Sequence, residues 1–350
     1  MIIKKEDVKQ ILVQAGKFGD YVQLQIEDYK AIVKSVGKKN IYFETEIKEI
    51  ENPIEGEFYI FDKQALDILQ KCPKDVTIEK NKKNKINIKS GEFKVSLAET
   101  NQSIIDIDEP QINYCLTVKD LNKVKNVRYA AASKDTRPAL ECVYFEVNPA
   151  IGKIRIIATD SYRVAIDEIN YECNEKIEKG SFLLDKKVLG DVISKDDDCA
   201  VLGVCDNKII FAFENGIVIG IDTLAEQYID IENMLASMKF SFQFKIKQEA
   251  FTKSIKRCKI GDKNSIKLSI GKSSLGIEVD SNETSVYITD EIEIVGVDEY
   301  LEVNLSLNYL SDALENMNSE YITVKYNDSS TFPILIEDDS NKAIILPVAK

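Results

Sequence analysis

The sequence predicts an α+β protein that contains three repeats of one domain. Short β-branched segments separated by polar turns fill most of the chain, as expected of strands. Six amphipathic helices interrupt them, and alternate helices start at a regular interval. The length of 350 residues accommodates two or three ordinary domains.

Six segments show the apolar spacing of an amphipathic helix. The first carries Val8, Ile11, Leu12 and Ala15 at positions i, i+3, i+4 and i+7. The second follows Asp62, a candidate N-cap, and directs Leu66, Leu69 and Cys72 inward. The other four are residues 118–132, the segment from Asp185 with Val188, Leu189, Val192 and Ile193, residues 247–259 with Phe251, Ile255 and Cys258, and a segment with Leu307, Leu310 and Leu314.

The repeat appears in the helix positions. The second, fourth and sixth helices start near residues 63, 185 and 307, so 122 residues separate each from the next. Each is followed by strand, polar turn, strand, tight turn and strand. The first turns are 82–84, 206–207 and 327–329, and the second are 90–92, 214–216 and 338–341. A period this long exceeds the roughly 20–50 residues of solenoid repeats.

The repeat therefore predicts three like-folded domains, at residues 1–113, 114–238 and 239–350. Each has two helices packed on a strand-rich layer. The alternative is a chance similarity between neighbouring α+β domains.

The composition excludes several kinds of site. Histidine is absent, so a Ser-His-Asp or Cys-His catalytic site is impossible within this chain. The chain has no GxGxxG, P-loop or HExxH motif. Its seven scattered cysteines form no CxxC pair, which favours reduced, buried side chains over a metal site. We therefore expect no catalytic residues, no cofactor and no metal.

The N-terminal and apolar segments predict the compartment. The chain begins Met1-Ile2-Ile3-Lys4-Lys5 and lacks the apolar core of a signal peptide. No apolar run approaches the roughly 20 residues that span a bilayer. We expect a cytoplasmic protein.

The charge is distributed unevenly. The net charge is −13, yet residues 4–17, 62–71, 118–137, 185–195, 247–259 and 306–317 together carry +9, which leaves −22 for the remainder. Lys253, Lys256 and Arg257 lie opposite the apolar stripe of their helix. Solvated helix faces are the plain interpretation, but basic helices on an acidic body also suit contact with a duplex backbone, without sequence reading.

Several stretches, in order along essentially the whole chain, resemble motifs of one known family. The segment 157–165, IATDSYRVA, resembles its ATDGHRLA signature. Further likenesses are 134–137 with 143–146 to "D-x-R…G-x-L-F-E", 90–97 to "SGxxxFSL", 308–314 to "Y-L-x-D-A-L", 333–336 to "PVLI", and 345–348 to the closing "V-M-P-M/V" strand. On these motifs the chain resembles the bacterial DNA sliding clamp, the beta subunit of DNA polymerase III.

The resemblance implies a fold and a function. The family has three domains of one fold per subunit, and two subunits form a six-domain ring around duplex DNA. Helices line the hole, and the ring tethers DNA polymerase and clamp loader through linear peptides. The resemblance therefore implies a homodimeric, non-enzymatic processivity factor for DNA replication, with no membrane association.

The resemblance also implies two sets of site residues. Helices facing DNA would present Lys119, Lys123, Lys125, Arg128, Lys134, Arg137, Lys253, Lys256 and Arg257. A peptide pocket between the second and third domains would use Thr159, Ser161, Tyr162, Arg163, Val164, Ile229, Asn233, Met234, Ser306, Tyr309, Pro333, Ile345, Leu346, Pro347 and Val348. Apolar walls with one aromatic ring and one guanidinium suit an extended peptide with hydrophobic anchors.

The chain departs from the family pattern at several places. The signature Gly-His is Ser161-Tyr162 here, the Phe-Pro-Asp-Tyr run is Tyr228-Ile229-Asp230-Ile231, and the tail is Val348-Ala349-Lys350. These changes predict altered peptide preference. Ring closure would pair 91–97 with 284–291, where apolar residues match more clearly than charges do.

Two other functions remain open. A clamp-like protein could bind peptides without closing a ring on DNA. A carboxylate-based hydrolase lacks a recognisable site, and Asp160 with Arg163 indicates a structural ion pair in a turn.

Overall fold

The computed structural model describes residues 1–37, 41–81, 85–98, 100, 105, 107, 110–193, 198–261, 264–281, 286–295 and 299–348. The chain forms two compact units. Unit 1 contains 1–119, 172–177 and 197–223, and unit 2 contains 120–171, 178–196 and 224–350. Within the described ranges, no helix is long and apolar enough to cross a membrane.

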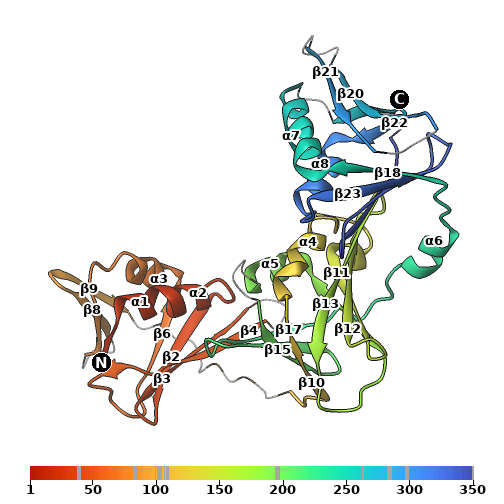
Figure 1. Ribbon diagram of the computed structural model, residues 1–350. Coiled ribbons are helices and arrows are strands. Elements are labelled where there is room, and N and C mark those ends of the chain that lie inside the picture. The colour runs from red at the N-terminus through yellow and green to blue at the C-terminus, as the bar shows by residue number, and fades with distance from the viewer. Residues whose placement is uncertain are drawn as a thin grey trace. The chain divides into compact units, whose positions relative to one another are not determined.

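Unit 1 consists of strands with a few short helices (Figure 1). Its strands are β1 (Ile2–Ile3), β2 (Tyr21–Glu27), β3 (Lys30–Val36), β4 (Tyr42–Ile47), β5 (Ile50–Glu51), β6 (Phe58–Asp62), β7 (Val76–Lys80), β8 (Lys85–Ser90), β9 (Phe93–Ala98), β10 (Tyr114–Val118), β15 (Ala200–Val204), β16 (Lys208–Phe213) and β17 (Val218–Asp222). Its helices are α1 (Lys5–Asp7), a π turn (Val8–Leu12), α2 (Val13–Ala15) and α3 (Lys63–Gln70).

The strands of unit 1 form two sheets. One has the order β5-β1-β7-β8-β9, and the other has the order β10-β15-β16-β17-β4-β3-β2-β6. Of the predicted inward residues of the two helical segments, Val8, Leu12, Ala15, Leu66, Leu69 and Cys72 are buried, whereas Ile11 is half-buried. Asp62 caps α3 by accepting the N–H of Ala65 at 2.8 Å.

Unit 2 has the same kinds of element. Its strands are β11 (Cys142–Asn148), β12 (Lys153–Thr159), β13 (Arg163–Glu172), β14 (Gly180–Asp185), β18 (Phe242–Lys247), β19 (Ser265–Ile270), β20 (Ser274–Ser281), β21 (Val286–Glu293), β22 (Leu301–Ser306), β23 (Tyr321–Tyr326), β24 (Ile334–Glu337) and β25 (Lys342–Ile345). Its α-helices are α4 (Lys125–Arg128), α5 (Lys186–Val192), α6 (Ile231–Ser237), α7 (Gln248–Cys258) and α8 (Leu307–Glu315). Short 3₁₀ turns cover Leu121–Val124, Pro138–Glu141 and Lys259–Gly261.

The strands of unit 2 also form two sheets. The larger runs β18-β23-β24-β25-β13-β12-β11-β14, and the smaller runs β21-β20-β19-β22. Helices α7 and α8 lie side by side (Figure 1) and bury Phe251, Ile255, Leu310 and Leu314 in the core that they share with the smaller sheet. The predicted stripes of both helices are therefore confirmed.

The order of elements repeats three times along the chain, which confirms the predicted repeat. Three four-stranded groups have matching orders: β6-β2-β3-β4, β14-β11-β12-β13 and β22-β19-β20-β21. A second series also matches: β1-β7-β8-β9, β10-β15-β16-β17 and β18-β23-β24-β25. The predicted turns separate these strands, except that 82–84 lies outside the described residues. The boundaries at 113/114 and 238/239 remain a prediction.

Two helix predictions need correction. The helix expected over 118–132 is only the 3₁₀ turn and α4, because Val118 still belongs to β10 and Asp120 adopts a left-handed φ of 61°. Helix α6 was not predicted, since its seven residues contain too few turns to show a clear period.

Candidate peptide-binding site and basic surfaces

The loop from Thr159 to Arg163 is a tight turn closed by its own side chains. Asp160 Oδ1 accepts the backbone N–H groups of Tyr162 and Arg163 at 3.0 and 3.1 Å. Thr159 Oγ1 donates to the carbonyl of Arg163 at 2.6 Å. Ser161 has a φ of 76°, a conformation that favours glycine. The turn leaves Tyr162 62% exposed.

The guanidinium of Arg163 connects four parts of unit 2. It donates to Asp160 Oδ2 at 3.0 Å, to Asp312 Oδ2 at 2.6 Å and to the carbonyl of Tyr129 at 2.9 Å. It also lies 4.3 Å from the ring centroid of Tyr309. Its side chain is 11% exposed, so these contacts replace water. The expected structural ion pair with Asp160 is confirmed.

Burial dominates the electrostatics around this guanidinium. It raises the pKa of Tyr129 well above its ordinary value, although the nearby Arg163 acts in the opposite direction. Burial also raises the pKa of Tyr309, with a contribution from Asp160. Both phenols are therefore neutral at physiological pH, and the guanidinium is balanced by Asp160 and Asp312.

The opposite face of strand β13 carries an apolar cluster. Successive residues of a strand point to opposite faces, so Val164 faces away from Arg163. Val164 packs in a buried cluster with Ile157, Ile166, Ile231, Leu335 and Ile344. Met234 and Met238 of the segment 224–241, here called the linker, pack against it. Val164 and Met234 thus belong to one apolar cluster, and their part in a peptide pocket remains a prediction.

The C-terminal residues contact the loop Thr159–Arg163, here called the signature loop. Leu346 donates its N–H to the carbonyl of Tyr162 at 2.9 Å, and Val348 donates to the carbonyl of Asn304 at 2.9 Å. Leu346, Pro347 and Val348 are half-buried, whereas Pro333 and Ile345 are buried. Ser306 caps α8 by accepting the N–H of Tyr309 at 3.4 Å.

The predicted pocket residues therefore lie on two faces of one sheet. Arg163 and Tyr309 lie on one side, and Val164 and Met234 lie on the other, while a backbone hydrogen bond in the plane of the sheet joins Leu346 to Tyr162. Ile229 and Asn233 belong to the linker and are exposed. Alternation along β13 separates Arg163 from Val164, but the placement of Tyr309 and Met234 on these two faces depends on tertiary packing, which the sequence does not show.

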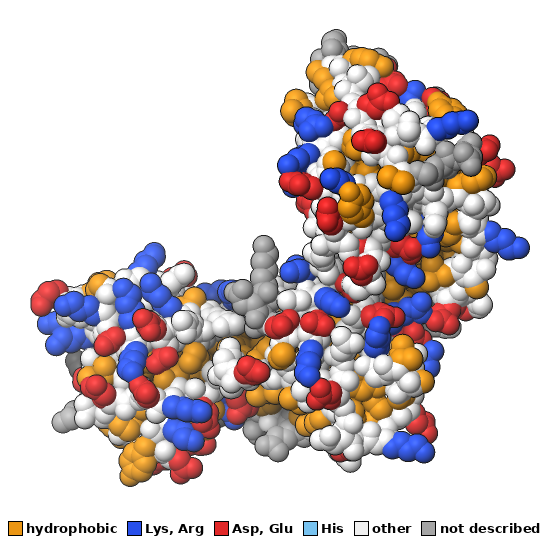
Figure 2. Space-filling model, in the orientation of Figure 1, with side chains coloured by type: hydrophobic (Ala, Val, Ile, Leu, Met, Phe, Trp, Pro, Cys, Tyr) orange, Lys and Arg blue, Asp and Glu red, His pale blue; other side chains and the backbone are white. Residues whose placement is uncertain are grey.

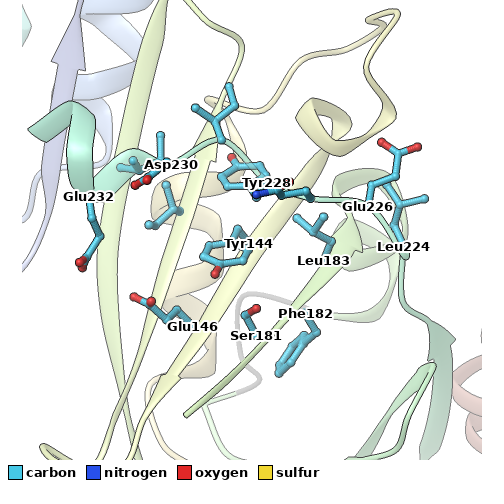
Figure 3. Close-up of a pocket in the computed structure, with 14 residues that line it drawn as sticks. Tyr144, Glu146, Ser181, Phe182, Leu183, Leu224, Glu226, Tyr228, Asp230 and Glu232 are labelled. Atoms are coloured by element: carbon cyan, nitrogen blue, oxygen red, sulfur yellow. The ribbon is translucent and has the colours of Figure 1, made fainter.

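A cavity of about 330 Å³ lies beside the first half of the linker. The rings of Tyr144 and Tyr228 stack at its centre with centroids 4.9 Å apart (Figure 3). The carboxylates of Glu146, Asp230 and Glu232 lie around them. Ile229 is the one predicted pocket residue among its described lining residues.

A second cavity, of about 420 Å³, lies beside the second half of the linker and is here called the linker cavity. Its apolar walls are Ile166, Leu235, Met238, Phe240, Leu335 and Ile344. None of the predicted pocket residues is among the described residues that line it. A signal was present in the sequence, since Leu235, Met238 and Phe240 are apolar in a segment between two repeats.

Helix α7 presents a charged outer face. Phe251, Ile255 and Cys258 are buried, whereas Lys253, Lys256 and Arg257 are more than half exposed, which confirms the predicted orientation. Each cation has an acidic neighbour: Lys253 pairs with Glu249 at 2.5 Å, Lys256 with Glu315 at 3.5 Å, and Arg257 with Asp290. Acidic and basic side chains are interspersed over the face seen in Figure 2.

The basic residues of 119–137 differ in exposure and in their partners. Lys123 is 24% exposed and donates to the carbonyl of Glu168 at 3.1 Å. Arg128 packs over Gly190, where an added Cβ would lie 1.6 Å from Nη1. Arg137 donates to Ser161 Oγ at 2.9 Å and so belongs with the signature loop.

The remaining residues of this set differ in surroundings. Lys125 and Lys134 are exposed in unit 2. Lys119 lies in unit 1, where it pairs with Glu172 at 2.5 Å. Contact of any of these residues with DNA remains a prediction.

Comparison with known proteins gives consistent matches. Residues 116–221 match the central domain of the DNA polymerase III beta subunit, and 238–349 match its C-terminal domain. No curated protein sequence matches the chain. Solved structures match over 100% of this chain and 99% of theirs, each with a TM-score of 0.87. They are a DNA polymerase sliding clamp from Pseudomonas aeruginosa at 17% identity, a DNA polymerase III beta chain from Streptococcus pneumoniae at 18%, and a putative DNA polymerase III beta subunit from Eubacterium rectale at 20%.

The repeated fold and the signature loop define a bacterial-type DNA sliding clamp. The chain belongs to the DNA polymerase III beta subunit family, of which it is a divergent member.

Proposed function

We propose that two copies of this protein close into a ring around duplex DNA and tether the replicative polymerase to it. The ring is a processivity factor without catalytic activity, acts in the cytoplasm and meets polymerase and clamp loader through their linear peptides. The observation that carries this proposal is the match of two beta subunit domains, 116–221 and 238–349.

The internal repeat supports ring closure. Strand β4 pairs with β17, and β13 pairs with β25, so the end strand of each of the first two four-stranded groups joins the last strand of the following repeat. The equivalent strands left over are β21 and β9, which end their sheets among the described residues. Such edges attract a partner strand. Pairing β21 of one copy with β9 of another, twice, closes a symmetric ring.

The repeat also predicts the register of that pairing. The first residues of β17 and β25, Val218 and Lys342, lie opposite Glu44 and Ile166. Glu44 lies two residues after Tyr42, which pairs with Val36 next to the turn of the β3–β4 hairpin. Ile166 likewise lies two residues after Val164, which pairs with Thr159 next to the turn of the β12–β13 hairpin. The corresponding hairpin pair is Ser281 with Val286, which places Phe93 opposite Ile288.

Antiparallel pairing then sets Lys94 opposite Tyr287 and Val95 opposite Val286. The interface is mainly apolar, which explains why the sequence shows no clear charge match. A closed ring stays on DNA by topology, so a few weak phosphate contacts suffice for sliding.

The peptide site belongs to the outer surface of unit 2. We infer that partner peptides contact the exposed Tyr162 and the half-buried Leu346 and reach Val164 and Met234 through hydrophobic anchors. Arg163, which is one of the fifteen expected residues, contributes indirectly, because it holds the loop Thr159–Arg163 to Asp312.

The function is tested by comparing how long the protein stays on circular DNA and on linear DNA. The protein is loaded on a nicked circular plasmid by the clamp loader of the same organism, and one cut then linearises the plasmid. We expect slow release from the circle and rapid loss after the cut. Equal release from both forms would favour the alternative, a clamp-like peptide-binding protein that does not close a ring.

A further inference from the structure

We propose that the linker cavity binds a short segment of a partner protein that carries apolar residues next to a carboxylate. This site shares none of the fifteen residues expected for the peptide pocket. The proposal therefore adds a second docking site and does not depend on ring closure.

The walls of the cavity provide an apolar cradle of suitable size. Its floor is the outer face of the larger sheet, where Leu335 lies opposite Ile344 and Ile166 lies opposite Lys342. Its roof is Met238 and Phe240 of the linker, with Leu235 beside them, all half-buried. A volume of about 420 Å³ lies within the usual range of binding pockets.

The rim carries one cation in excess. Lys325 pairs with Glu337 at 2.5 Å, and Lys342 reaches the same carboxylate only at 4.0 Å. The third cation, Arg155, pairs with Glu232 at 2.6 Å, and Glu146, which also contacts Arg155, pairs with Lys179 at 2.8 Å. Lys342 is 54% exposed, so it can meet a ligand without being buried. A single carboxylate on the ligand complements this rim.

The backbone at the cavity edge favours a peptide over other ligands. Strand β18 ends its sheet, and Phe242 and Gln243 line the cavity. Lys245 exchanges backbone hydrogen bonds with Val295 on the side away from β23. Because this direction alternates along a strand, the N–H and C=O of Gln243 also point away from β23, to a side where the described residues place no paired strand. An extended peptide can add to such an edge while its side chains enter the cavity.

Methionine methyl NMR can locate a bound probe, because the chain has four methionines. Met238 lines the cavity, whereas Met317 is buried in another core. The probes are Ac-Ser-Leu-Leu-Glu-Ser-NH2 and the same peptide with glutamine in place of glutamate. We expect both to shift the Met238 methyl and leave Met317 unchanged. The glutamate peptide should bind about 3- to 10-fold more tightly, since the ion pair is partly exposed.

Variants assign the contact. Lys342→Gln should reduce the affinity for the glutamate peptide to that for the glutamine peptide, with unchanged thermal unfolding. Lys272→Gln, at another exposed lysine, should have no effect. Tyr162→Ala should also have no effect, since Tyr162 belongs to the signature loop. The proposal is wrong if Met238 stays unshifted at millimolar peptide, if both peptides bind equally, or if Tyr162→Ala is the variant that weakens binding.

Discussion

Ser161 occupies the place of the signature glycine and keeps the backbone conformation that glycine favours. Its φ is 76°, and its Oγ accepts a hydrogen bond from Arg137 at 2.9 Å. A left-handed conformation costs a residue with a Cβ about 1–2 kcal/mol. The hydrogen bond offsets part of this cost, which explains how a serine is tolerated in the turn.

Ser161→Gly should raise the free energy of unfolding by about 0.5 kcal/mol. The relief of backbone strain exceeds the lost hydrogen bond and the greater chain entropy of glycine. Urea unfolding measures the change, and Ser161→Ala serves as the control because it keeps the Cβ but loses the hydroxyl. If the alanine variant is as stable as the glycine variant, the left-handed conformation carries no cost here.

At the scale of single residues, the sequence predicts contacts that are local in the chain. The pair of Asp160 and Arg163 and the cap by Asp62 involve residues three positions apart. The bond of Arg163 to Asp312 joins residues 149 positions apart and depends on tertiary packing. No local pattern encodes it.

At the scale of elements, helices with a full apolar stripe were predictable and short ones were not. Helix α7 has eleven residues and buries Phe251, Ile255 and Cys258 as expected. Helix α6 has seven residues and buries only Ile231, so its sequence resembles a loop. The linker 224–241, which contains α6, nevertheless lines both cavities. Its apolar residues can be interpreted only once the sheet on which they pack is known.

Met234→Ala should weaken binding of a polymerase-derived clamp-binding peptide about 5- to 150-fold. Loss of one buried hydrophobic anchor contact costs about 1–3 kcal/mol. Fluorescence anisotropy measures the affinity, and thermal unfolding shows whether the variant remains folded. Met238→Ala on the same linker should bind this peptide normally. Unchanged affinity for Met234→Ala would place the peptide site elsewhere.

Lys253→Glu combined with Lys256→Glu should shorten residence on circular DNA and weaken its dependence on salt. Each phosphate contact releases counterions, so loss of contacts lowers the salt slope. The fold should tolerate the change, since exposed substitutions usually cost within about 0.5 kcal/mol. Lys239→Glu with Lys272→Glu changes net charge equally and is the control. Equal residence of the two double variants would show that α7 does not face the DNA.

At the scale of the whole molecule, the period of the helices predicts three repeats, and the strand orders confirm them. The sequence does not predict that β4 pairs with β17, because that pairing joins residues 174 to 178 positions apart. Once this pairing is known, the unpaired equivalents β9 and β21 follow from symmetry. The apolar residues of these strands were visible in the sequence, but their register was not.

Phe93→Glu should weaken dimerisation about 5- to 150-fold without unfolding the chain. Phe93 is 38% exposed in the single chain, and the ring would bury it against Ile288 of the other copy, where a carboxylate would lose its hydration. Sedimentation over a range of concentrations measures the dimer. Ile151→Glu, at an exposed turn residue, should leave the dimer intact. A normal dimer in the Phe93 variant would rule out pairing through β9.

Covalent closure of the ring on DNA tests the central claim most directly. Lys94→Cys and Tyr287→Cys are introduced after the cysteines that are not buried, Cys115, Cys173 and Cys199, are replaced by serine. The variant is loaded on a nicked circular plasmid and oxidised, because opposed strand residues lie within disulfide distance. We predict that the protein then migrates with the circle in SDS and leaves it after reduction or a single cut. Release in SDS from an oxidised two-chain species, or failure to form that species, would contradict a ring closed through β9 and β21.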